Sequence, residues 1–200
     1  VVIVHGGHEH YQLPSPRMQE TYRFFIDAGA DAVVNHHQHC YSGYEYYNGK
    51  PIVYGLGNFC FDEDVNHAAI WYEGYGVEID TNNSSIKLIP YRQCDKLAEV
   101  QPMDGCNLST FKQRITELNA IIADDILLQA EFDKWVEKNA KYKMITFAPY
   151  FHRYLNAAAS RGWIPMKLKS KLAGSLLNHI ACESHRDITI MVMNRKLNKH

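Results

Sequence analysis

The first 34 residues read as a strand, a helix and a second strand, and this order constrains the fold more than any other feature of the chain. Val1 to Val4 is a β-branched run of the kind found in strands buried on both faces. A helix is predicted from Ser15-Pro16, a capping residue followed by proline at the first turn, to a stop at Gly29. Residues 32–34 form the next short apolar strand. A strand, helix, strand unit implies a parallel pair with a right-handed crossover, and therefore an α/β fold.

Two hairpins are expected to add antiparallel strands. The first joins Tyr44 to Tyr47 with Ile52 to Tyr54 through Asn48-Gly49, a pair suited to a tight reversing turn. The second joins residues 75–80 with residues 86–91 through a polar turn. The predicted fold class is therefore α/β, with a mixed sheet that contains a parallel unit and hairpins, followed by a helical C-terminal extension.

The pattern changes beyond residue 93. Residues 94–107 show no clear periodicity and include Pro102 and Gly105, which favours a linker. An apolar stripe at helical spacing follows and continues toward Phe132 and Trp135; it consists of Phe111, Ile115, Leu118, Ile122 and Ile126. Further helices are predicted near residues 147–159 and 168–180. The expected organisation is an α/β part over 1–93, a linker over 94–107 and a helical extension over 108–200.

Composition excludes several classes of protein. The net charge of -1 gives no reason to expect nucleic acid as a partner, and no apolar run approaches the roughly 20 residues of a membrane span. Five cysteines without a C-x-x-C pair argue against a disulfide framework and a zinc knuckle. The chain opens on Val1 rather than Met, already inside a core strand, so we expect a fragment, and the compartment stays undetermined.

Histidines gather where the two parallel strands end. His5 ends the first strand, and His36, His37 and His39 follow the second. Open α/β sheets bind ligands at this edge, where the loops that leave parallel strands converge. In an extended segment His37 and His39 face one side and His36 the other, so His37 and His39 form the natural chelating pair. Together with His5 they predict a site for a metal such as zinc, manganese or iron, and the alternative is a set of exposed loop contacts.

The remaining histidines carry less information. His8 and His10 cannot both join His5 on one metal ion. Four others, scattered along the chain, are expected to be polar surface residues or satisfied core residues: His67, His152, His179 and His185.

Three motifs in this order resemble the CapA family of capsule-biosynthesis proteins, also called the poly-gamma-glutamate capsule proteins. They are "HGGHEHYQLPSPRMQ", "DAGADAVVNHHQH" and "YGLGNF", and their spacing agrees over about the first 60 residues. The family's domain is similar to the calcineurin-like metallophosphoesterases. The chain departs from the family pattern at Gly6, His10, Asn35 and Gln38, which stand where the family has tryptophan, tyrosine, glycine and proline.

The resemblance implies a role for each site residue. His5, His37 and His39 would be the later half of a dinuclear site for Mn, Zn or Fe, whose carboxylate half lies upstream of Val1 in relatives. His36 and Glu9 would be the catalytic candidates, although Glu9 also fits a negative charge placed ahead of a helix. Glu9 and Asn58 would contact substrate, and Asn58 also fits a turn held through backbone hydrogen bonds.

Two functions follow from the resemblance. One is a metal-dependent hydrolase, in which bound cations polarise a phosphoryl oxygen and activate water. The other is a non-catalytic factor that binds or exports an anionic capsule polymer. The expected partners are that polymer or a phosphoester, and other capsule-synthesis proteins, in a bacterium and at its cell envelope.

Three further interpretations receive less support. A cupin also uses H-x-H followed by glutamate, here Glu45, but the helix between the strands contradicts an all-β barrel. Cys182 and His185 of "CESHRD" suggest a thiol nucleophile, yet their spacing suits a helix start better. An interaction role of the helical extension would use its aromatic residues, which helical spacing more often places in a core: Phe147, Tyr150, Phe151, Tyr154 and Trp163.

Overall fold

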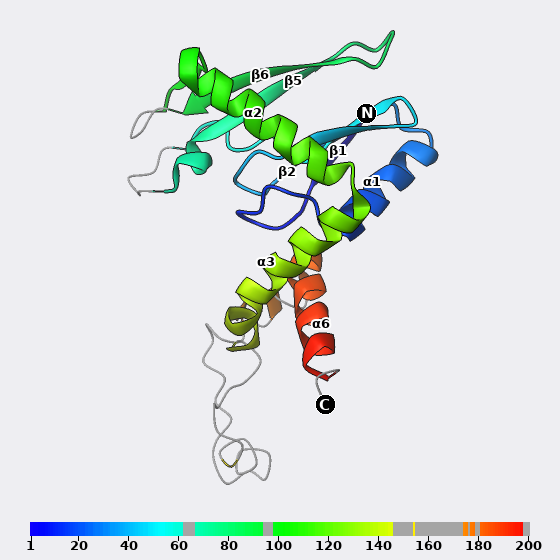
Figure 1. The fold of residues 1–200 in the computed structure, drawn as a ribbon, viewed down its shortest axis with the longest axis vertical. Coiled ribbons are helices and arrows are strands. Elements are labelled where there is room, and N and C mark those ends of the chain that lie inside the picture. The colour runs from blue at the N-terminus through cyan, green and yellow to red at the C-terminus, as the bar shows by residue number, and fades with distance from the viewer. Residues whose placement is uncertain are drawn as a thin grey trace. The chain divides into compact units, whose positions relative to one another are not determined.

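The structure is a computed structural model that describes residues 1–61, 67–93, 98–145, 154, 174–175, 177–178 and 181–197. It divides into two compact units, Val1–Phe132 and Asp133–His200 (Figure 1). The helices predicted over 147–159 and 168–180 lie almost entirely outside the described residues. The first unit contains every predicted site residue.

The core of the first unit is a four-stranded mixed sheet. Its strands are β1 (Val2–His5), β2 (Val33–His36), β3 (Tyr44–Tyr47) and β4 (Lys50–Val53), in the spatial order β1-β2-β4-β3. β1, β2 and β4 are parallel, and β3 is antiparallel to β4. The predicted α/β fold class with a mixed sheet is confirmed.

Helix α1 (Pro16–Asp27) makes the crossover from β1 to β2. It begins where the sequence predicts, because the Ser15 hydroxyl accepts a hydrogen bond from the Met18 backbone N–H at 3.3 Å and caps the helix. Its Tyr22 ring is buried and stacks on Tyr54, with 5.7 Å between the ring centroids. Gly29 follows the helix with a φ of 108°, a conformation that suits glycine at a helix end.

The turn between β3 and β4 also forms as predicted. Asn48 and Gly49 both have positive φ, 52° and 75°, as a tight hairpin turn of this type requires.

The second predicted hairpin belongs to a separate antiparallel sheet. It consists of β5 (Glu73–Ile79) and β6 (Ile86–Gln93), and β7 (Val100–Pro102) pairs with the other edge of β6. A short 3-10 helix, η1 (Ala69–Tyr72), precedes β5. The segment 94–107 therefore contains a strand and the start of the next helix.

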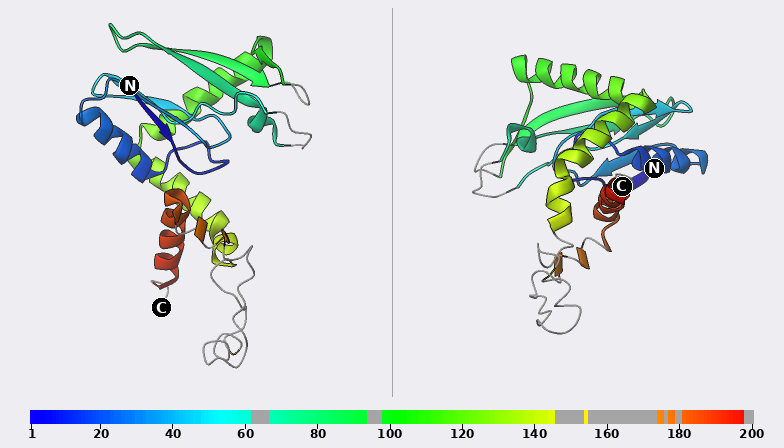
Figure 2. Two further views of the ribbon diagram at one scale, coloured as in Figure 1. Left: turned by 180° about the vertical axis from the view of Figure 1, so that it is seen from behind. Right: turned by 60° about the horizontal axis from the view of Figure 1, so that its bottom comes forward.

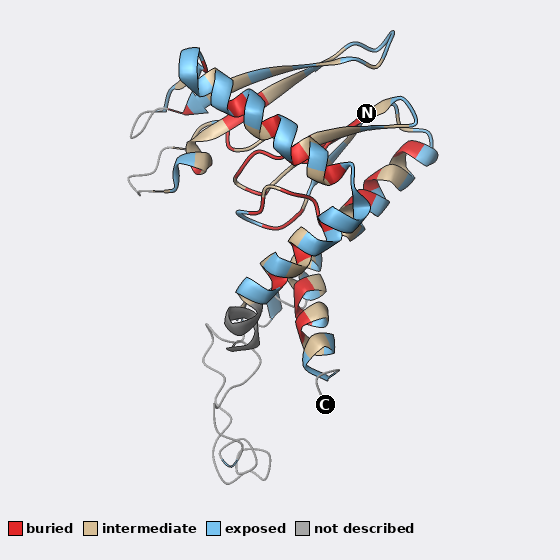
Figure 3. Ribbon diagram, viewed as in Figure 1, coloured by how far each residue is buried: buried red, intermediate tan, exposed pale blue. Residues whose placement is uncertain are grey.

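Helix α2 (Gly105–Ile122) packs on both sheets (Figure 2). Its predicted apolar positions from Phe111 to Ile122 are buried (Figure 3). The centroid of the Phe111 ring lies 5.0 Å from that of Tyr41 and 5.7 Å from that of Tyr75. The expected continuation of the stripe to Ile126 is wrong, because this side chain is 84% exposed. α2 ends at Ile122, and a new helix, α3 (Asp125–Ile145), begins. The buried positions of α3 do not continue the helical spacing of those in α2.

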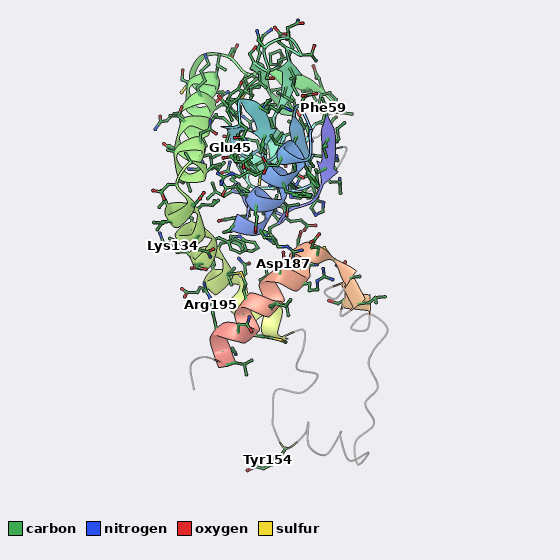
Figure 4. All side chains as sticks on the ribbon, turned by 90° about the vertical axis from the view of Figure 1, so that its right-hand side faces the viewer. Glu45, Phe59, Lys134, Tyr154, Asp187 and Arg195 are labelled. Atoms are coloured by element: carbon green, nitrogen blue, oxygen red, sulfur yellow. The ribbon has the colours of Figure 1, made fainter. Side chains whose placement is uncertain are left out.

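In the second unit, α6 (Glu183–Leu197) pairs with the part of α3 that belongs to this unit. Arg195, labelled in Figure 4, forms ion pairs with Asp133 and, at 3.3 Å, with Glu137. The sequence indicated only the start of α6, at Cys182 to Asp187. Along the helices that the structure describes, none is both long enough and apolar enough to cross a lipid bilayer.

Candidate functional site

The parallel register of β1 and β2 brings the first two histidines together. His5 and His36 are the last residues of their strands and are directly paired across the ladder. Their ring centroids lie 4.5 Å apart. The predicted convergence at the carboxyl edge of the sheet is therefore present in the geometry.

A short chain of ring contacts joins three imidazoles. His5 Nδ1 lies 3.0 Å from His36 Nδ1, and His5 Nε2 lies 3.1 Å from His37 Nδ1. Each contact needs one N–H and one lone pair, so the tautomers of the three rings are coupled. The His39 ring lies next to this chain, with 6.0 Å between its centroid and that of His37.

His36 shares the pocket with His37 and His39, although an extended segment would place it on the opposite side from them. His37 and His39 have positive φ, 129° and 56°, so the backbone turns after β2 instead of continuing as a strand. The alternation of side-chain direction that would send His36 to the opposite side therefore ends at this point. Positive φ is uncommon for residues other than glycine, although histidine adopts it more often than most, and such conformations concentrate at functional sites.

Two of the rings are held in the neutral form. Burial lowers the pKa of His36, and the neighbouring His5 ring adds to this effect. The pKa of His37 is lowered by burial and by His5, while the Glu9 carboxylate offsets part of the shift. Both rings are therefore uncharged at neutral pH, which is the form of imidazole that binds metal ions.

The orientation of His39 is fixed by Asn58. The Asn58 side chain is 5% exposed, and its Nδ2 donates to the Trp71 carbonyl at 2.9 Å. Its Oδ1 therefore faces His39 Nδ1, at 2.9 Å, and accepts a hydrogen bond from it. With the proton on Nδ1, the Nε2 atom of His39 carries the lone pair. Metal-binding histidines characteristically donate their other N–H to an oxygen in this way.

Glu9 lies at the margin of the cluster. Its Oε1 is 3.9 Å from His37 Nε2, and the side chain is 49% exposed. It is not a charge at the start of α1, whose first turn contains no acidic residue. Glu9 therefore lies near the histidines but forms no close hydrogen bond with them.

The four histidines and Asn58, but not Glu9, line one pocket of about 310 Å³, which we call the histidine pocket. Both sheets contribute to it, because Tyr91 comes from β6. The lining residues are His5, His36, His37, His39, Leu56, Gly57, Asn58, Phe59, Phe61 and Tyr91.

The other described histidines lie elsewhere in the fold. His8 is buried and stacks on Phe132 at 5.4 Å, whereas the His10 ring is 6.0 Å from His39, outside the pocket lining. His67 stacks on Trp71 at 3.9 Å. His185 belongs to α6, and His152 and His179 lie outside the described residues. Glu45, the cupin-type carboxylate, instead binds Arg23 at 2.7 Å.

The buried side-chain amide of Asn35 links the ends of strands β1, β2 and β4. Asn35 is fully buried; its Nδ2 donates to the carbonyls of Gly6 and Tyr54, and its Oδ1 accepts from the Gly6 N–H and the Tyr22 hydroxyl. In the sequence, Asn35 stands out only as a departure from the family pattern. A polar residue inside an apolar strand is the signal that could have identified this supporting role.

The imidazoles suit a divalent metal by their chemistry but do not form a complete ligand set. Within the described parts of the chain, no group of three or more His, Cys, Asp or Glu residues is arranged to hold a metal ion. Metal binding by His5, His37 and His39 stays a prediction.

Comparison with known proteins supports the resemblance over the segment that contains most of the pocket. Residues 1–63 match the family model described as bacterial capsule synthesis protein PGA_cap. The same number of residues, 63, is 43% identical to the capsule biosynthesis protein CapA of Bacillus anthracis and 46% identical to the PGA biosynthesis protein CapA of Bacillus subtilis strain 168. A stretch of 50 residues is 48% identical to the uncharacterized protein y4sH of Sinorhizobium fredii.

The matched segment is short relative to these proteins. It covers 32% of this chain and 15% and 17% of the two Bacillus proteins; for the Sinorhizobium protein the shares are 25% and 11%. The resemblance to the CapA family predicted from the motifs is confirmed for residues 1–63, and it extends to His5, His36, His37, His39, Glu9 and Asn58.

Proposed function

We propose that this chain takes part in the biosynthesis of an anionic capsule polymer, of the kind that its relatives' names describe as PGA. The match over residues 1–63 supports this function, since it includes the four histidines of the pocket. The matched segment is less than a fifth of the length of either Bacillus relative. The partners would be the polymer itself and other proteins of capsule synthesis.

Within this function, the histidine pocket would bind an anionic group of the polymer together with a divalent metal ion such as Mn, Zn or Fe. The observation that carries this proposal is the His39 ring, whose Nδ1–H is committed to Asn58 and whose Nε2 carries the lone pair. His37 adds its Nε2 atom, because its Nδ1 lies against His5 Nε2. His5 would have to leave its contacts with His36 and His37 to offer a nitrogen. A bound cation would supply positive charge for carboxylate or phosphoryl oxygens.

The test is a calorimetric titration of Mn²⁺ and Zn²⁺ into the chain, followed by a titration of poly-gamma-glutamate. His37→Ala and His39→Ala should each weaken metal binding at least tenfold, because each removes one imidazole donor. His185→Ala, a histidine outside the pocket, is the matched control and should bind as the unsubstituted chain does. Unchanged binding of metal and polymer in both pocket variants would contradict the proposal.

Hydrolysis is a second candidate, and the contact between Glu9 and His37 favours it. A carboxylate 3.9 Å from a neutral imidazole is a suitable pair for accepting a proton from water, with His36 as the adjacent neutral base. Metal-dependent turnover of bis-(p-nitrophenyl) phosphate that is lost in His37→Ala would support hydrolysis. Polymer binding without turnover would support a factor that handles or exports the polymer.

A further inference from the structure

Phe59 is an exposed aromatic residue at the wall of the histidine pocket. Its side chain is 66% exposed although it lines the pocket, and it is labelled in Figure 4. Its ring meets Tyr91 edge to face, with 5.3 Å between the centroids and 85° between the planes. Aromatic rings that line a concave site are typical surfaces for the nonpolar part of a ligand.

Tyr91 reaches the pocket because two glycines let the two sheets touch. Gly57 and Gly74 form an isolated backbone bridge between the segment after β4 and strand β5. A Cβ at Gly57 would lie 2.5 Å from the Glu73 carbonyl oxygen, and one at Gly74 would lie 2.9 Å from the Tyr91 ring. Backbone contact therefore fixes the position of this ring relative to Phe59 and the histidines.

The wall formed by these two rings is uncharged. Burial raises the pKa of the Tyr91 hydroxyl to about 12, so it stays protonated at neutral pH. Phe61 extends the nonpolar surface toward the histidines, with its ring 5.8 Å from that of His39. The pocket thus has imidazole nitrogens in one part and aromatic rings in another.

We propose that Phe59 and Tyr91 form a binding wall for the aliphatic part of a ligand whose carboxylate lies at the histidines. The ligand class is a carboxylate carried on a short methylene chain, as in a glutamyl unit, rather than an inorganic anion. This inference rests on the proposed function and adds the residues that select the substrate. The pocket volume of about 310 Å³ suits a short polymer segment.

The experiment is an NMR titration of the full chain with tri-γ-glutamate in the presence of Zn²⁺, followed through the imidazole carbon-bound protons. Phe59→Ala should lower the affinity about tenfold, because it removes the aromatic surface from the methylene groups. Phe24→Ala is the matched control: Phe24 is 63% exposed on α1 and lies outside the pocket lining.

The possible results separate this inference from the proposed function. Weaker binding of tri-γ-glutamate by Phe59→Ala, with histidine signals of the free protein unchanged, supports the wall. Equal binding by Phe59→Ala and the unsubstituted chain overturns the wall and leaves the proposed function standing. Displaced histidine signals in free Phe59→Ala overturn it too, because Phe59 would then support the cluster instead of binding ligand. No binding of tri-γ-glutamate overturns the ligand class, and the metal titration then decides the proposed function independently.

Discussion

The side-chain oxygen of Asn58 accepts a hydrogen bond from Nδ1 of His39, and this contact determines which nitrogen of the ring faces away with a lone pair. Asn58 cannot reverse its amide without turning its own oxygen toward the Trp71 carbonyl. One asparagine after β4 thereby sets the chemical form of a histidine that follows β2.

Replacing Asn58 with leucine should release the His39 tautomer. The ring would lose its acceptor at Nδ1, so the population protonated at Nε2 should rise, and affinity for Zn²⁺ should fall by about 10-fold to 100-fold. Nitrogen-15 NMR of the imidazoles measures the tautomer directly. A tautomer population unchanged in Asn58→Leu would contradict this assignment.

Asn35→Ala should destabilise the first unit by about 2–3 kcal/mol. The substitution removes the amide that satisfies the buried Tyr54 carbonyl and the half-buried Gly6 carbonyl. The Gly6 N–H keeps a second acceptor, the His36 carbonyl. Urea denaturation followed by circular dichroism gives the change in unfolding free energy. Asn82→Ala removes an amide from an exposed turn and should change stability by less than about 0.5 kcal/mol. Equal effects of the two substitutions would argue against a supporting role of Asn35.

Acid should weaken the fold through the pocket histidines. The pKa values of His36 and His37 are lowered by burial in the folded state, so the unfolded chain binds protons more readily below about pH 6.5. Stability should therefore be retained above this pH and fall as the pH drops toward the folded-state values. Denaturation midpoints at pH 7.5 and 5.5 test this, and His37→Gln should reduce the difference between them. A difference as large in His37→Gln as in the unsubstituted chain would exclude His37 as a contributor.

Cys40 should resist alkylation in the folded protein. Burial raises the pKa of its thiol to about 12, and the thiolate is the reactive form. Cys106 is exposed at the start of α2 and should react with iodoacetamide at least about a hundredfold faster at pH 8. Peptide mass spectrometry after timed quenching gives both rates, and a denatured sample should show them converging. Comparable rates in the folded protein would mean that Cys40 is accessible.

Local signals in the sequence were sufficient for the first sheet and for the location of the site. The β-branched run of β1, the Ser15-Pro16 helix start and the Asn48-Gly49 turn each depend on neighbouring residues alone, and each forms where the sequence predicts. The expected burial of β1 on both faces is wrong, because β1 ends the strand order of its sheet and Ile3 is 74% exposed. The parallel crossover then places His5 beside His36, because strands joined in this way end at the same edge.

The tertiary structure decided which residues share the pocket and in what form. His37 and His39 join His36 there because positive φ at both turns the backbone after β2, and no periodicity reveals such a turn. Tyr91 lies there because Gly57 and Gly74 bring a second sheet into backbone contact. Side-chain spacing along one segment carries no information about contacts between segments far apart in the chain, and these contacts set the burial, the tautomers and the aromatic wall of the site.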